Sequence, residues 1–308
     1  MARHREAKKN INGILLLDKP LGISSNKALQ SVKTLYGARK AGHTGSLDPL
    51  ASGMLPLCFG EATKFSQYLL DANKCYRVTG RLGIKTTTAD REGEIIKQVD
   101  DFSLDLAQLE KVLTQFRGEI EQVPSMYSAL KHNGTPLYKL ARQGIEVERP
   151  ARKVTIFELK LLDFDGASFS LEVKCSKGTY IRNLVEDIGD ELNLGAHVSE
   201  LRRLYTDPYI DYPMVTMDSL AQLAQEKEMD KMMALILPIE SILINYPTLS
   251  LDESLAYFIR NGQSILHSGA PEHGYVRLLN QDEKLLGIGE VTEDGRVAPR
   301  RLMTKQIA

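Results

Sequence analysis

Cysteine is scarce in this chain. It has three cysteines, Cys58, Cys75 and Cys175, and no pair shows the CxxC spacing of many metal and redox sites. Disulfide frameworks and structural zinc sites need more cysteines, paired or closely spaced. The count therefore argues against both, and it predicts reduced thiols in a cytoplasmic protein.

Long apolar runs are also missing. No stretch approaches the roughly 20 apolar residues that a membrane-spanning helix needs, so we expect no membrane segment. The first ten residues, MARHREAKKN, are basic and polar. They lack the apolar centre of a secretory signal, and we expect residues 1–10 to form a disordered basic arm.

The chain carries little net charge. Its formal charge is −1 and its pI is about 6.6, whereas domains that coat nucleic acid usually have a pI above about 9. The charge is uneven, however, since residues 131–153 contain six basic side chains and only two acidic ones. Such a stretch permits RNA binding on one face of the molecule.

The hydrophobic pattern predicts a mixed α and β protein with one large domain and one small one. Strands are expected over residues 14–17, 54–59, 75–84, 154–164 and 168–175, and helices over 24–36, 61–70, 104–116, 218–236 and from about 180. Near Pro247 the pattern changes to a short helix (252–260) and glycine-punctuated strands (275–302). We place a domain boundary at about residue 246.

Residues 124–152 differ from their surroundings. They include Pro124, Pro136 and Pro150, and most of the basic side chains noted above. Prolines interrupt regular structure, and charges favour solvent. The pattern indicates an exposed basic segment, called here the 124–152 excursion.

A loop rich in glycine and proline, GHTGSLDPLASG (42–53), lies between two apolar segments. Within it Asp48 precedes Pro49, which restricts the aspartate backbone to extended conformations. A carboxylate on such a rigid loop can act as a nucleophile. Most Asp-Pro pairs, however, form turns or helix caps, and the spacing alone leaves both readings open.

Two further candidates are a histidine and an aromatic residue. His43 lies beside the loop, and no other ligand stands at a spacing that suits a metal site, so no metal is expected. It can be a structural hydrogen-bonding group or, if the partner is RNA, can stack on or replace a base. Tyr76 at the start of a strand can pack in a core or form a platform for a flipped base.

The remaining candidates are cations. Arg182 lies in the first turn of a predicted helix, where the helix dipole disfavours positive charge. This misfit suggests a carboxylate partner, for which Asp48 is the candidate, although a surface arginine is the plain alternative. Lys19 and Lys64 can be solvated side chains or phosphate contacts.

Together these segments resemble the TruB family of tRNA pseudouridine synthases, nearly along the whole chain. The most specific matches are HTGSLDPLASG (43–53) and KGTYIRNL (177–184). Further matches are NGILLLDKPLGISS (12–25), KCYRVTGRLGIKTTTADREGE (74–94), VPSMYSALKHNGTPLYKLARQGIEVERPARKV (123–154) and GIGEVTEDGRVAPRRL (287–302).

The resemblance implies an α+β pseudouridine synthase fold with a central mixed or antiparallel sheet. It implies a catalytic domain over 11–246, with the 124–152 excursion clamping RNA, and a small β-rich PUA-like RNA-binding domain over 247–308. The implied reaction isomerises uridine 55 in the T-loop of tRNA, without cofactor or metal. We expect a monomer that binds the T-arm of tRNA, without a membrane or an obligate protein partner.

The resemblance also implies roles for single residues. Asp48 is the nucleophile, Tyr76 stacks on the base and is a candidate for removing its C5 proton, and Arg182 orients the aspartate. The substrate-binding positions are His43, which enters the tRNA loop, Lys19, Lys64, Tyr180 and Leu201.

Two other functions are compatible with parts of the pattern. A tRNA-folding chaperone without essential catalysis predicts that Asp48→Asn leaves the cellular role intact. A hydrolase with an aspartate nucleophile would need a second carboxylate across the bond, or a magnesium site built from further acids. Neither is visible near the 42–53 loop.

Overall fold

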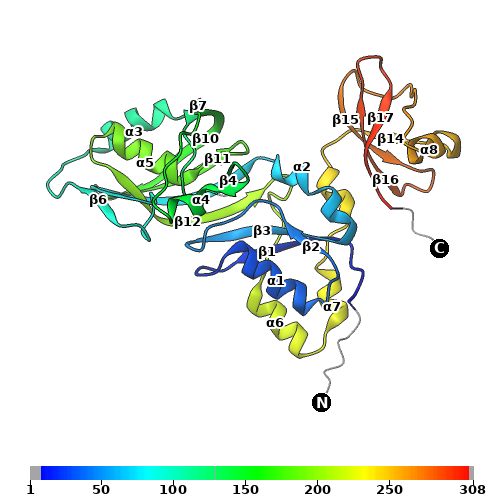
Figure 1. Cartoon of the computed structure of the whole chain (residues 1–308), viewed down its shortest axis with the longest axis horizontal. Coiled ribbons are helices and arrows are strands. Elements are labelled where there is room, and N and C mark those ends of the chain that lie inside the picture. The colour runs from blue at the N-terminus through cyan, green and yellow to red at the C-terminus, as the bar shows by residue number, and fades with distance from the viewer. Residues whose placement is uncertain (1–7, 129, 305–308) are drawn as a thin grey trace.

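The computed structural model describes residues 8–128 and 130–304 (Figure 1). Within these ranges no helix has the length and apolar character that crossing a membrane requires. The expected basic arm falls mostly on residues 1–7, outside the described residues. Lys9, close to it, pairs with the backbone of Ala38.

A nine-stranded sheet forms the centre of the molecule. Its order is β13-β1-β3-β12-β4-β11-β10-β7, with β2 on β3, and only the β1–β13 and β3–β12 pairs are parallel. The strands are β1 Gly13–Lys19, β2 Ala41–His43, β3 Ala51–Phe59, β4 Lys74–Leu82, β7 Gly118–Gln122, β10 Arg152–Phe164, β11 Ser168–Cys175, β12 Ala196–Thr206 and β13 Val215–Thr216. The predicted α+β fold with a central mixed sheet is confirmed.

Helices cover two parts of this sheet (Figure 1). Side chains of α3 and α5 pack on β4, β10, β11 and β12, and those of α1, α6 and α7 pack on β1 and β3. The helical elements are α1 Ser25–Leu35, η1 Gly60–Lys64, α2 Ser66–Leu70, α3 Leu106–Gln115, α4 Leu137–Ala141, α5 Ile181–Glu191, α6 Met217–Gln225, α7 Met229–Ala234 and η2 Ile239–Leu243.

Strand β1 is buried on both faces. Leu15 and Leu17 belong to the core under α1, while Ile14 and Leu16 face the core shared with α2 and η2. A strand between two cores needs apolar residues at consecutive positions. This explains the uninterrupted ILLL run in the sequence.

Two predicted helices are divided in the structure. The segment 218–236 forms α6 and α7, because Lys227 has a φ of +61° that an α-helix does not accommodate. The segment 61–70 forms η1 and α2, and the N–H of Phe65 bonds to Ala62 in the tighter 3₁₀ manner. Helix α1 begins as predicted, with the Ser24 side chain accepting from the N–H of Lys27.

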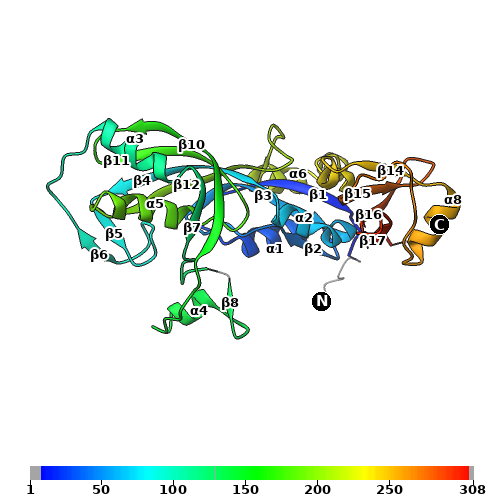
Figure 2. The ribbon, with the colours of Figure 1, turned by 90° about the horizontal axis from the view of Figure 1, so that it is seen from above.

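The 124–152 excursion extends from the sheet between β7 and β10. It contains the short hairpin β8 (Lys131–His132) and β9 (Thr135–Pro136), followed by α4. Figure 2 shows α4 and β8 projecting well away from the sheet. A second small hairpin, β5 (Ile84–Thr86) with β6 (Ile95–Gln98), lies at another edge.

A smaller β-rich part follows residue 247. Strands β14 (Thr248–Ser250), β15 (Gly274–Leu279), β16 (Leu285–Val291) and β17 (Val297–Leu302) form one sheet beside α8 (Glu253–Arg260). This sheet has its own core, and Leu285 and Ile288 of β16 also join the core around η2. The rings of Tyr68, Tyr246 and Tyr275 pack edge to face across the same junction.

We predict that Gly53→Ala destabilises the protein more than Gly166→Ala does. Both glycines have positive φ, so alanine adds backbone strain of about 1–2 kcal/mol at either position. At Gly53 the new Cβ would also lie 2.1 Å from the carbonyl oxygen of Arg203, whereas at Gly166 it would meet nothing within 4 Å. Urea unfolding should show a further loss of about 1–3 kcal/mol for Gly53→Ala, and equal losses would contradict this account.

Candidate active site

Asp48 lies on the loop between β2 and β3, which is anchored on both sides of the aspartate. Leu47 and Leu50 are buried in the core beneath α5. The buried hydroxyl of Ser25 accepts from the N–H of Leu47 at 2.7 Å and donates to its carbonyl at 2.9 Å. Apolar burial and these two bonds hold the backbone, while the Asp48 side chain stays 41% exposed.

Arg182 binds the Asp48 carboxylate. Its Nε lies 3.0 Å from Asp48 Oδ2, and the arginine side chain is only 7% exposed. Its Nη1 lies 3.3 Å from Oδ2 of Asp90 and donates to the carbonyl of Thr88, while its Nη2 donates to the carbonyl of Tyr127 at 2.8 Å. One guanidinium thus joins two carboxylates and two backbone segments.

The sequence analysis did not identify Asp90. Its side chain is 5% exposed, and its Oδ1 accepts from the Thr88 hydroxyl at 2.6 Å and from the N–H of Glu92. These local bonds fix Asp90 Oδ2 toward Arg182. A polar turn in the segment TTTADREGE was the only sequence signal, and nothing in its spacing links it to Asp48.

Burial governs the charge of the nucleophile candidate. Desolvation raises the pKa of Asp48, Arg182 opposes that rise, the nearby Asp90 adds to it, and Lys19 opposes it. Lys19 itself is buried on β1, and its Nζ donates to the carbonyls of Pro20 and Ile23 at 2.8 Å. Desolvation lowers the pKa of Lys19 to about 8.

Tyr76 and Leu201 lie on neighbouring strands beside the loop. Tyr76 on β4 is half-buried and pairs in register with Arg203 on β12. Burial raises the pKa of Tyr76, and the Arg203 guanidinium opposes that rise. Leu201 is buried on β12, in register with Ala51, where the loop becomes β3.

Arg203 was also missed in the sequence. Its side chain is 1% exposed, and it donates to the carbonyls of Met54 and Gly45 at 2.6 and 3.2 Å. The guanidinium thereby binds both the Asp48 loop and β3. Only the run Leu201-Arg202-Arg203 marked this position, and which arginine turns inward depends on the β-bulge between Arg203 and Tyr205 and on the neighbouring strands.

The other predicted positions divide into two groups. Tyr180 is the N-cap residue of α5, two residues before Arg182, and His43 ends β2 at the start of the loop. Burial lowers the pKa of His43, helped by Arg203, so its ring is neutral. Lys64 lies elsewhere in its contacts, because its Nζ binds Glu61, the Leu302 carbonyl and Thr304.

One local expectation was wrong. Thr179 does not cap α5: its hydroxyl donates to the carbonyl of Ser176. The helix begins instead at Tyr180, whose backbone is bound by the side chain of Gln122.

The arrangement presents an oriented carboxylate beside an aromatic ring. Within residues 8–128 and 130–304, no group of three or more His, Cys, Asp or Glu side chains is placed to hold a metal ion. Arg182 keeps Asp48 Oδ2 occupied and leaves Oδ1 for attack. Such a site can perform nucleophilic catalysis on an electrophilic carbon held against Tyr76.

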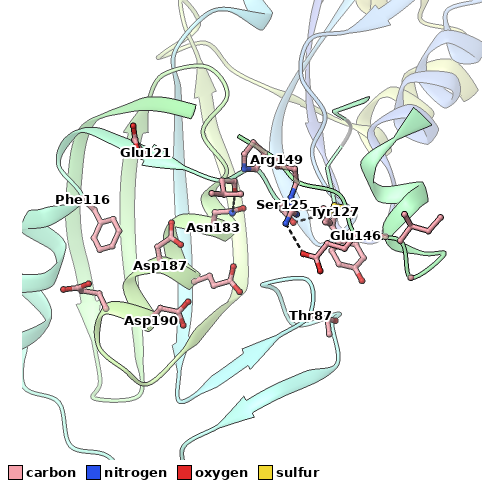
Figure 3. Close-up of a pocket in the computed structure, with 18 residues that line it drawn as sticks. Thr87, Phe116, Glu121, Ser125, Tyr127, Glu146, Arg149, Asn183, Asp187 and Asp190 are labelled. Carbon is pink, nitrogen blue, oxygen red and sulfur yellow. Dashed lines mark hydrogen bonds and ion pairs between the residues drawn. The ribbon is translucent and has the colours of Figure 1, made fainter. Parts of the chain in front are cut away.

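A cavity of about 910 Å³ lies outside this site, between the 124–152 excursion and α5 (Figure 3). Acidic side chains dominate its lining, including Glu121, Glu146 and Asp187, with Arg149 paired to Glu146. Burial and neighbouring acids raise the pKa of Asp187 to about 6. This lining repels phosphate, so we place RNA on the other surfaces of the excursion.

Comparison with known proteins identifies the class. A solved structure entitled a Cbf5-Nop10-Gar1 complex shares the fold at a TM-score of 0.73 and 25% identity, covering 99% of this chain and 87% of that chain. Sequence models match residues 33–181 (TruB family pseudouridylate synthase, N-terminal domain), 182–244 (tRNA pseudouridylate synthase B C-terminal domain) and 247–303 (pseudouridine synthase II TruB, C-terminal). The class is that of the pseudouridine synthases.

Two bacterial relatives extend this match over the full length. The chain is 52% identical over 304 residues to tRNA pseudouridine synthase B of Coxiella burnetii, covering 97% of both chains. It is 50% identical over 314 residues to the protein of that name from Yersinia pestis, covering 100% of this chain and 97% of the other. The chain belongs to the TruB family of pseudouridylate synthases and is an isomerase.

We predict a bell-shaped dependence of turnover on pH. The Asp48 carboxylate must be ionised to attack, and its raised pKa moves the acid limb above that of an ordinary aspartate. The Lys19 ammonium is present below its pKa of about 8 and lost above it, so the rate should fall again on the alkaline side. Single-turnover rates from about pH 5 to about pH 9 measure both limbs.

Lys19→Met separates the two limbs. It should lower the rate near neutral pH and remove the alkaline limb while leaving an acid limb. An alkaline limb that persists in this variant would assign it to another group.

Proposed function

We propose that this protein isomerises uridine 55 in the T-loop of tRNA to pseudouridine, with Asp48 as the nucleophile. The observation that carries the proposal is the Asp48 carboxylate on an anchored loop, bound by the buried Arg182 at 3.0 Å. The tRNA substrate is supported by the name of the 52% identical relative. We further propose that the enzyme acts in the cytoplasm as a monomer, without cofactor, metal or obligate protein partner.

The target uridine must leave its stack to reach Asp48, at a cost of a few kcal/mol. Stacking of the flipped base on Tyr76 returns about 1–3 kcal/mol of this. Tyr180 and Leu201 line the pocket, and the neutral His43 ring enters the tRNA loop beside the flipped nucleotide. Lys19 and Lys64 are the basic positions on the RNA side.

Attack by Asp48 forms a covalent adduct, at ribose C1′ or at uracil C6. The bond between C1′ and N1 breaks, uracil turns within the pocket, and a bond between C1′ and C5 forms. The C5 proton then leaves to Tyr76 and ultimately to solvent, and Asp48 is released. Arg182 keeps the carboxylate ionised and oriented through these steps.

We propose the following division of labour along the chain. Residues 11–246 form the catalytic domain, and within it the 124–152 excursion clamps the T-arm. Residues 247–308 form a PUA-like RNA-binding domain. The projection of α4 and β8 from the sheet supports the clamp, since it extends basic side chains into solvent (Figure 2).

We predict that Asp48→Asn abolishes turnover while tRNA binding is retained. Asparagine keeps the size of the side chain but is no nucleophile at this site. The assay is tritium release from an unmodified tRNA transcript labelled at uracil C5, with binding measured on the same preparations. Release by Asp48→Asn at the wild-type rate would remove Asp48 from the mechanism.

Arg182→Ala serves as a second variant in this assay and should lose most turnover. If the wild type binds tRNA tightly but releases no tritium, the chaperone function replaces the synthase proposal. Magnesium-dependent hydrolysis would instead favour the aspartate hydrolase.

We predict that replacing Lys139 and Arg142 by glutamine weakens tRNA binding and reduces its salt dependence. Both side chains are exposed, at α4 and at its C-cap, and Arg142 lies over the Tyr138 ring. Each lost phosphate contact should lower the slope of log affinity against log salt by about 1. Lys160→Gln, an exposed lysine on β10, is the control and should leave the slope unchanged.

A further inference from the structure

Gln122 is a buried polar residue on a strand whose other side chains are exposed or half-buried. It is 2% exposed and is the last residue of β7, immediately before the 124–152 excursion. Burying an amide is unfavourable unless its hydrogen bonds are made. The partners of this amide therefore explain its position.

The Gln122 amide binds both backbone groups of Tyr180. Its Oε1 accepts from the Tyr180 N–H at 3.0 Å, and its Nε2 donates to the Tyr180 carbonyl at 3.2 Å. No side chain caps the start of α5 from within the helix, so Gln122 satisfies a backbone donor that the helix leaves free. This pair of bonds fixes the direction in which α5 starts, two residues before Arg182.

The base of the excursion contacts α5 at two further points. Asn183 Nδ2 donates to the carbonyl of Val123 at 2.8 Å, and Arg182 Nη2 donates to the carbonyl of Tyr127 at 2.8 Å. Figure 3 shows Asn183 and Tyr127 in this region, where the excursion passes over α5. The guanidinium that holds Asp48 is therefore bound to the same segment that Gln122 anchors.

We propose that Gln122 is a positioning residue that couples the 124–152 excursion to the Asp48–Arg182 pair. It touches neither the substrate nor the reacting atoms. It holds the N-terminus of α5 against the base of the excursion, so that Arg182 Nε stays on Asp48 Oδ2. RNA held by the excursion thus presses on the element that orients the nucleophile. This inference rests on the proposed function, in which Asp48 attacks the uridine.

The test compares Gln122→Met with the wild type under single-turnover conditions at saturating tRNA. Methionine has a similar volume and makes neither bond to Tyr180. We expect the rate to fall by about 10- to 100-fold, as for a misplaced catalytic group, while the Kd for tRNA stays within about threefold. A rate equal to the wild type, or a raised Kd with an unchanged saturated rate, overturns the proposal.

Two further variants sharpen the comparison. Gln143→Met replaces an exposed glutamine of the same excursion and should retain wild-type rate and affinity. Gln122→Glu keeps the size and the acceptor for the Tyr180 N–H, so it should recover part of the rate lost in Gln122→Met. A Gln122→Glu rate no higher than that of Gln122→Met overturns the proposal.

If Gln122→Met does not fold, as judged by circular dichroism and melting, Gln122→Glu is compared with the wild type directly. A several-fold loss of rate at unchanged Kd is then expected, since one bond is lost, and a wild-type rate overturns the proposal. The proposed function fails separately, because an inactive wild type refutes the synthase assignment whatever the variants do.

Discussion

The active site depends on one buried cation. The Arg182 guanidinium lies between the carboxylates of Asp48 and Asp90, and its remaining donors bind the carbonyls of Thr88 and Tyr127. A buried charge is costly unless paired, and removing one partner of such a pair is strongly destabilising. The loop of the nucleophile, the turn around Asp90 and the base of the excursion are therefore tied to one side chain.

The protein supports this cation with a rigid frame rather than a flexible pocket. Leu47 and Leu50 anchor the Asp48 loop in the core, and Ser25 binds the backbone next to the aspartate. Arg203 binds the same loop from the sheet side. Preorganisation of this kind lowers the cost of bringing a nucleophile to its target, and it explains why glycine is needed where β3 approaches β12.

Charge is distributed to match these roles. The excursion carries exposed cations into solvent, whereas the cavity between its base and α5 is lined by acids and so excludes phosphate. Lys64 joins η1 to the C-terminal sheet through Leu302 and Thr304. Its ammonium therefore links the catalytic part to the small β-rich part, in addition to any contact with RNA.

The sequence by itself determined the features that depend on near neighbours. Apolar runs predicted β1 and β3, a serine cap predicted the start of α1, and the Gly/Pro loop marked Asp48. Motifs rather than periodicity indicated the family. Only the tertiary structure revealed Asp90, which lies 92 residues from Arg182, and the roles of Gln122 and Arg203. Strand order and register decide these contacts, because they determine which side chains on distant segments turn toward one another.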